Sequence, residues 1–202
     1  MLGTVDFSGI QPDCTDHFLL EVYLQQLVGQ PLLHFRFSYG DELTVHFGEP
    51  RPYSSAKLKH LIKGSYILGT RASNWYLTTV APPMVLIGTQ DSTLHTTTNL
   101  QPLSKQDLES APLISPGTRV HSATVLAVGN PTSSGQGYRL SIMFTDGAVL
   151  RVSPEFAEKP ADAENTIADW ELLTCHDRYL RAGPGWYWSY SVSRNQGGAP
   201  IG

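Results

Sequence analysis

The alternation of apolar and polar residues predicts one helix near the N-terminus. Apolar residues recur at helical spacing between about Asp16 and Val28, which is typical of an amphipathic helix. The apolar positions are Phe18, Leu19, Val22, Tyr23, Leu27 and Val28. Gly29 and Pro31 follow and should end the helix, because glycine suits the left-handed backbone at helix ends and proline has no amide hydrogen.

After this helix the period of the pattern changes to two. Residues 33–37 and 43–47 alternate apolar with polar side chains, as half-buried strands do. A loop at residues 39–41, with Gly40 at a positive φ, brings the apolar side chains to one face of a hairpin. The expected apolar pairs are Phe37 with Leu43, Phe35 with Val45, and Leu33 with Phe47. A two-residue loop would mix the two faces and is therefore disfavoured.

The same alternation returns at residues 138–152. A loop at Thr145-Asp146-Gly147 would form a second hairpin. Its expected pairs are Ile142 with Leu150 and Leu140 with Val152. Between the two hairpins, residues 66–68 and 75–80 are predicted strands, and Ser54 to Lys63 is predicted to be a short basic helix.

The two hairpins match without gaps over residues 37–45 and 144–152, and Asn74-Trp75 then corresponds to Asp169-Trp170. This pattern suggests an internal duplication, although two hairpins of a common kind also resemble each other by chance. We therefore expect an α+β fold of mainly antiparallel β-hairpins with one amphipathic N-terminal helix. The expected division is a helix plus β-rich half over 1–90, a polar, proline-containing connector over 91–116, and a second β-rich half over 117–202. A single compact domain is the alternative.

The C-terminal third carries a resemblance. Residues 168–174 (ADWELLT), 177–181 (DRYLR) and 183–185 (GPG), after a hairpin ending in 150–155 (LRVSPE), resemble small β-rich bacterial proteins of unknown function. Some of those proteins are grouped with toxin-immunity proteins. The resemblance includes no catalytic motif, and it implies a binding role.

Composition narrows the class of protein. The chain is 41% hydrophobic and 16% charged with a net charge of -4, which favours a packed core over disorder. Neither half is basic, so no nucleic-acid partner is expected. The N-terminal residues lack the pattern of a secretion signal, and the longest apolar stretch, 80–87, contains two prolines. We therefore expect a cytoplasmic protein with no membrane partner.

Two histidines are the candidate metal ligands. The first hairpin's register places His34 directly across from His46 on the polar face, with Arg36 opposite Thr44. Two imidazoles at cross-strand distance suit zinc or copper, but a catalytic zinc needs a third protein ligand. The alternative is a pair of solvated surface histidines.

The two cysteines, Cys14 and Cys175, form no CxxC pair, so neither a disulfide scaffold nor a cysteine-rich zinc site is expected. Cys175-His176-Asp177 resembles a nucleophile, a base and an acid in sequence. Consecutive strand residues point to opposite faces, however, which disfavours a catalytic triad there. A remote histidine, His17 or His121, is the other way to activate Cys175.

The candidate partner-binding residues lie in an aromatic segment near the C-terminus. In a strand, Trp186, Trp188 and Tyr190 would share one face, and Tyr187 would lie on the other. Aromatic residues of this kind are common in protein interfaces, and they also close small β-cores.

The sequence contains none of the nucleophile-elbow, phosphate-loop, dinucleotide or HExxH motifs. The leading hypothesis is a non-enzymatic protein-interaction module, immunity-like or otherwise partner-neutralising, with a protein partner and no cofactor. One alternative is a small metal-dependent hydrolase that uses His34 and His46, and another is a glycan-binding module. The sequence leaves the partner's identity and the oligomeric state open.

Overall fold

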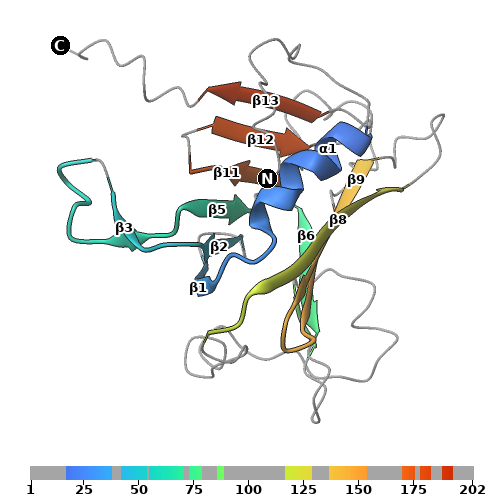
Figure 1. Cartoon of the computed structure of the whole chain (residues 1–202), viewed down its shortest axis with the longest axis horizontal. Coiled ribbons are helices and arrows are strands. Elements are labelled where there is room, and N and C mark those ends of the chain that lie inside the picture. The colour runs from blue at the N-terminus through green and yellow to red at the C-terminus, as the bar shows by residue number, and fades with distance from the viewer. Residues whose placement is uncertain are drawn as a thin grey trace.

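The protein is a sandwich of two antiparallel β-sheets with a short helix at one side (Figure 1). The structure, a computed structural model, describes residues 17–37, 42–53, 55–70, 73–78, 86–88, 117–128, 137–153, 170–175, 178–182 and 188–192. The predicted connector over 91–116 and the predicted loop at 39–41 therefore both lie outside these residues. The coarse expectation of hairpins with one N-terminal helix is confirmed.

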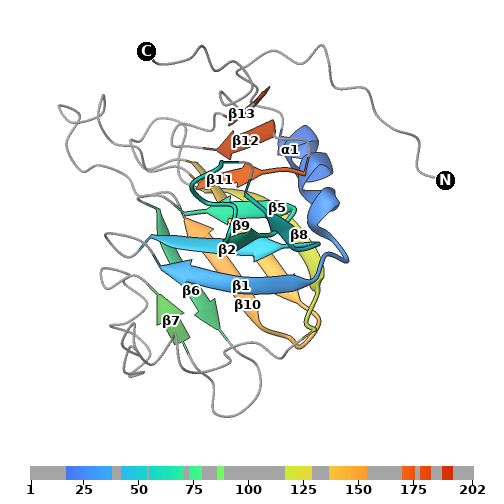
Figure 2. The same cartoon turned by 90° about the vertical axis from the view of Figure 1, so that its left-hand side faces the viewer.

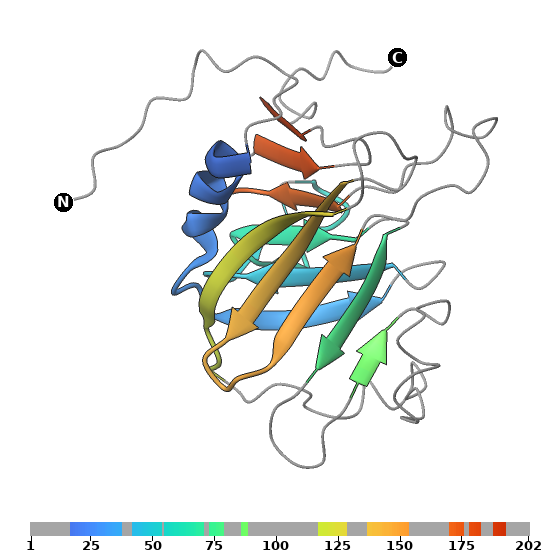
Figure 3. The same ribbon diagram turned by 90° about the vertical axis from the view of Figure 1, so that its right-hand side faces the viewer.

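Over the residues described, one sheet has six strands and the other has five, and Figures 2 and 3 show the outer side of each in turn. In spatial order, the six-stranded sheet consists of β1 (Leu32–Phe37), β2 (Leu43–Phe47), β5 (Tyr66–Gly69), β11 (Trp170–Leu173), β12 (Arg178–Ala182) and β13 (Trp188–Val192). The five-stranded sheet consists of β7 (Leu86–Gly88), β6 (Asn74–Thr78), β10 (Val149–Ser153), β9 (Gly137–Phe144) and β8 (Val120–Val128). A separate pair, β3 (Arg51–Pro52) and β4 (Ile62–Lys63), projects from the six-stranded sheet.

Each sheet takes strands from both the 1–90 and the 117–202 ranges. β5 pairs with β11 in the six-stranded sheet, and β6 pairs with β10 in the five-stranded sheet. The strand that carries Trp75 and the strand that carries Trp170 thus both lie in the sheet opposite to their preceding hairpin. The sequence duplication itself stays a prediction.

The strands of both predicted hairpins pair with each other, and most of the expected residue pairs are present. In the second, Ile142 pairs with Leu150 and Leu140 with Val152, and Gly147 has a φ of 89° in the three-residue loop. In the first, Phe35 pairs with Val45 and Phe37 with Leu43.

One pair of the first hairpin was predicted wrongly. Leu32, and not Leu33, lies opposite Phe47, because a bulge interrupts the register between Leu32 and His34. A bulge adds one residue to one strand, and alternation alone does not reveal where it occurs.

The helix α1 (His17–Leu24) continues as a 3-10 helix (Gln25–Leu27), and Gly29 follows with a φ of 81°. Its start and end agree with the sequence prediction, but its buried face is different. Leu20, Tyr23, Leu24 and Leu27 are buried, and Phe18 is 66% exposed. Among the described residues, no helix is long and apolar enough to cross a membrane.

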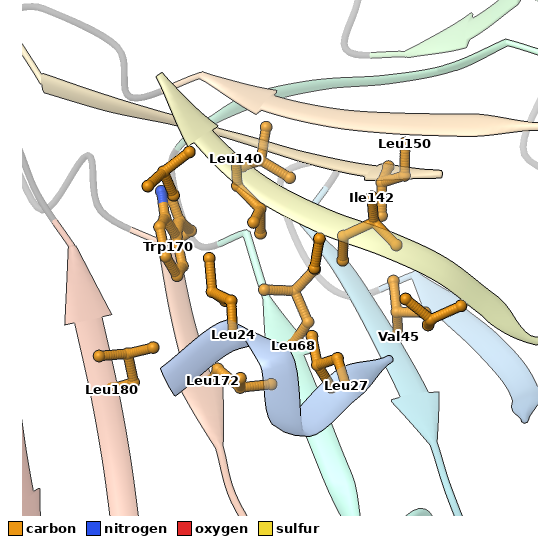
Figure 4. Close-up of a cluster of buried hydrophobic side chains, with 14 of the residues drawn as sticks. Leu24, Leu27, Val45, Leu68, Leu140, Ile142, Leu150, Trp170, Leu172 and Leu180 are labelled. Atoms are coloured by element: carbon orange, nitrogen blue, oxygen red, sulfur yellow. The ribbon is translucent and has the colours of Figure 1, made fainter. Parts of the chain in front are cut away.

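The core lies between the sheets, where the inward side chains of both meet (Figure 4). Trp170 of β11 is fully buried, and its indole N–H donates a hydrogen bond to the carbonyl oxygen of Tyr138 in β9 at 2.8 Å. The helix packs against β8, and the ring of Tyr23 contacts the rings of Trp188 and Tyr190 in β13. Because α1 touches an edge strand of each sheet, it closes one side of the sandwich.

Candidate functional site

The outer face of the six-stranded sheet is formed by the residues that alternate with the core positions. Two rows of side chains cross its strands, as the cross-strand pairs show. The first row is Arg36, Thr44, Gly69, Glu171, Arg181 and Ser189, and the second is His34, His46, Ile67, Leu173 and Tyr179. This face therefore mixes charges, hydroxyls and apolar side chains.

An arm, residues 51–63, projects beside this face. It consists of β3, β4 and the turns between them, and the N–H of Tyr53 donates to the carbonyl oxygen of Leu61 at 3.3 Å. The prediction of a helix from Ser54 to Lys63 is wrong. The apolar side chains of this segment do not cover a core, since Leu58 is 40% and Ile62 is 47% exposed. A short helix that packs on nothing has little other source of stability.

The base of the arm is joined to β2 by His46. The N–H of Gly64 donates a hydrogen bond to Nδ1 of His46 at 3.1 Å, which assigns the ring proton of neutral His46 to Nε2. A side chain at position 64 would overlap the backbone of Phe47, so glycine permits this close approach. The hydroxyl of Ser65 adds a bond to the carbonyl oxygen of Glu49 at 3.1 Å.

His34 and His46 lie opposite each other, as the sequence predicted, and their rings stack with centroids 4.2 Å apart and planes 25° apart. His46 is 1% exposed, so it is not a solvated surface histidine. Burial, followed by the positive charges of its neighbours, lowers the pKa of His46 to about 4. Burial and Arg36 also lower the pKa of His34.

The stacked arrangement is a poor geometry for holding one metal ion. Ring lone pairs lie in the ring planes, so two nearly parallel rings direct them side by side and not toward one point. Nδ1 of His46 already accepts the hydrogen bond from Gly64. Within the described part of the chain, no three His, Cys, Asp or Glu side chains gather as a metal site would require. Calorimetric titration of the protein and of His34→Ala with zinc tests the metal hypothesis directly.

A pocket of about 350 Å³ lies between the arm and the outer face, and we call it the arm pocket. The sheet contributes Thr44, Ile67, Gly69, Glu171, Leu173 and Tyr179 to its lining, and the arm contributes Tyr53, Ser55, Leu58 and Lys63. Gly69 leaves room at the centre of the floor, where a Cβ atom would only touch the Glu171 side chain at 3.5 Å. Both the sheet side and the arm side of the pocket therefore combine apolar, aromatic and polar side chains.

The charged groups of the arm pocket have partners of their own. Arg181 donates to the carboxylate of Glu171 at 3.3 Å, which offsets the negative charge at the sheet side. The Lys63 ammonium lies 5.6 Å from the centroid of the Tyr53 ring, within the range of a cation–π contact. The lining is therefore suited to a ligand that brings both apolar surface and hydrogen-bonding groups.

The aromatic residues of β13, which were predicted to bind a partner, lie partly in the core. Trp188 and Tyr190 share one face of β13, as predicted, but Trp188 is 1% exposed and packs on Tyr23 of the helix. Trp188 is therefore part of the core and is not available to a partner. Trp186 and Tyr187 lie outside the described residues.

Cys175 is half-buried, and its thiol donates to the hydroxyl of Tyr66 at 3.4 Å. Burial and this contact raise the pKa of Tyr66. Cys14, His176 and Asp177 lie outside the described residues, and so does the side chain of His17. The structure thus shows no catalytic arrangement around Cys175 among the side chains it describes.

Comparison with known proteins gives no further guide to the site: no family model matches the chain, and no similar curated protein or solved structure is found.

Proposed function

We propose that this chain is a non-enzymatic protein-interaction module that binds its partner on the outer face of the six-stranded sheet. The observation that carries the proposal is the arm pocket, about 350 Å³ in volume and walled by a projecting arm. Pockets that receive a central side chain of the partner are typical of the energetically dominant part of protein interfaces.

The surroundings of the pocket support a protein partner. Leu58 and Ile62 expose large apolar side chains on the arm, and Tyr53 and Tyr179 bring aromatic rings to the pocket. Tyrosine is enriched at protein interfaces, where its ring supplies contact area and its hydroxyl a hydrogen bond. An immunity-like, partner-neutralising role is the specific form that we propose, on the strength of the resemblance carried by residues 168–185.

Affinity capture with three baits tests the proposal. Gly69→Leu fills the arm pocket, and Ser141→Leu adds the same side chain to an outward position of the other sheet. From a native lysate of cells that express the chain, we expect one protein to be captured stoichiometrically by the wild type and by Ser141→Leu, but not by Gly69→Leu. Equal capture by all three folded baits, or capture by none, would contradict the proposal.

Glycan binding is a second candidate, because two tyrosines, Tyr53 and Tyr179, line a pocket that also holds a carboxylate. Aromatic rings can pack on the apolar faces of sugars while polar groups bind the hydroxyls. Calorimetry with neutral oligosaccharides is the test. Binding that Tyr179→Ala abolishes and Tyr76→Ala, on the other sheet, preserves would favour this candidate over a protein partner.

A further inference from the structure

The arm is basic within an acidic chain. The charged side chains of the arm, residues 51–63, are Arg51, Lys57, Lys59 and Lys63, and Glu49 precedes it next to Arg51, whereas the whole chain has a net charge of -4. Lys57 and Lys59 are exposed at the turns of the arm. A local cluster of one sign on a projecting element attracts groups of the opposite sign even when the protein as a whole repels them.

Apolar groups accompany these charges. Leu58 lies between Lys57 and Lys59 in the sequence and is one of the residues that line the arm pocket. Lys63 also lines the pocket, above the ring of Tyr53. A ligand that fits the arm must therefore offer negative charge to the turns and, within a few residues, an apolar or aromatic group to the pocket.

We propose that the partner presents an acidic polypeptide segment containing an aromatic residue, whose carboxylates contact the lysines of the arm and whose aromatic side chain enters the arm pocket. This inference rests on the proposed function and names the chemistry of the partner. The charge of the arm sets orientation and association rate, as charges at the rim of an interface do, and the pocket supplies the specific contact.

A random copolymer of glutamate and tyrosine is the probe, with polyglutamate of the same length as its comparison. Fluorescence anisotropy with labelled polymers measures both affinities at physiological salt. We expect the copolymer to bind about tenfold more tightly than polyglutamate, the ratio that one well-buried anchor side chain gives. Equal affinities would overturn the proposal.

Two variants separate the contributions of charge and pocket. Lys57→Glu combined with Lys59→Glu should weaken the binding of both polymers about tenfold, since each exposed ion pair contributes modestly. Gly69→Leu should remove the advantage of the copolymer and leave polyglutamate binding unchanged. Arg139→Glu with Arg151→Glu, which changes the net charge equally on the other sheet, is the matched control and should alter either affinity less than about twofold.

Other polyanions show whether the site is specific. Heparin or single-stranded DNA that binds as tightly as the copolymer, with the same sensitivity to Gly69→Leu, would overturn the proposal in favour of a general polyanion site.

The proposed interaction module and the proposed acidic, aromatic segment can be contradicted separately. A lysate protein that depends on the open pocket, together with no preference for the copolymer, would uphold the interaction module and reject the acidic, aromatic segment.

Discussion

The outer faces of the two sheets differ although both belong to one sandwich. On the five-stranded sheet, Arg139 donates to Ser153 at 2.9 Å, and Arg151 lies 5.7 Å from the centroid of the Tyr76 ring. Both arginines thus contact residues of their own sheet. On the six-stranded sheet, the arm stands beside the strands and forms a pocket with them. The difference comes from the connections: β9 and β10 are joined by a tight three-residue loop, whereas β2 and β5 are joined through the arm.

In this sandwich the inward residues determine the fold, and the connection between β2 and β5 creates the candidate site. Both sheets bury alternating apolar residues in a common core. Connections are the part of a fold where binding residues can be added without disturbing the core. We therefore expect core substitutions to affect both faces and arm substitutions to affect one.

Replacement of Trp188 should have the largest effect. Its ring is 1% exposed and packs against Tyr23, so Trp188→Ala leaves a large cavity beside the helix. We expect a loss of about 3–5 kcal/mol in the free energy of unfolding, measured by urea denaturation. A loss under about 1 kcal/mol would show that β13 does not close the core.

Acid should destabilise the six-stranded face through His46. The folded pKa of about 4 lies below the ordinary value of 6.5, so the unfolded chain takes up a proton that the folded chain excludes as the pH falls through this window. The contribution of neutral His46 to the free energy of unfolding is therefore fully present above pH 6.5. It is lost as the pH falls toward 4, and the loss is about 3 kcal/mol at most.

His46→Asn checks the origin of this decline, because the amide oxygen can still accept the bond from Gly64 but does not titrate. The slope of unfolding free energy against pH should become shallower in this window. His121→Asn, which removes an exposed histidine of β8, is the matched control. An unchanged slope in His46→Asn would show that His46 is not the group responsible.

The base of the arm should be more sensitive than the pocket floor. Gly64→Ala forces a Cβ atom against the backbone of Phe47, and we expect a loss of about 1–3 kcal/mol in urea denaturation. Gly69→Ala meets only the Glu171 side chain at ordinary contact distance, and we expect a change within about 0.5 kcal/mol. Similar losses in the two variants would contradict the close approach at Gly64.

The ion pair in the pocket should contribute least. The Arg181 and Glu171 side chains are 49% and 24% exposed, so solvent screens their attraction. Glu171→Gln should change the unfolding free energy by less than about 1 kcal/mol in thermal denaturation. A larger loss would mean that this pair helps to hold β11 to β12.

Local patterns were enough to predict the two hairpins, because the period of two and the loop length together determine which residues pair. The same patterns do not reveal that β5 pairs with β11 or β6 with β10, since these strands are distant in sequence and any alternating strand could take either place. The arm was mistaken for a helix because Ser54 and Gly64 stand where a helix cap and a helix end would, and such end signals do not show whether a core is present for the helix to cover.

The candidate site was partly visible in the sequence. Alternation placed His34 and His46 on one face, but it does not say whether another segment covers that face, and His46 is buried beneath the base of the arm. The arm pocket arises where residues about 100 positions apart meet, such as Gly69 and Glu171. Gly69, at the end of β5, is a glycine inside a strand, which can mark a close approach of another group, but its place in the sequence does not say which residues lie around it.

Hydrogen exchange measured with the captured partner shows which face of the sandwich the partner covers. Amides of the protein are compared with and without the partner at equal protein concentration. Binding at the arm pocket predicts slower exchange in residues 51–63 and in β5 and β11, which contribute most of the sheet side of the pocket, with β8 to β10 unchanged. Slower exchange confined to β8, β9 and β10 would place the partner on the five-stranded sheet and contradict binding at the arm pocket.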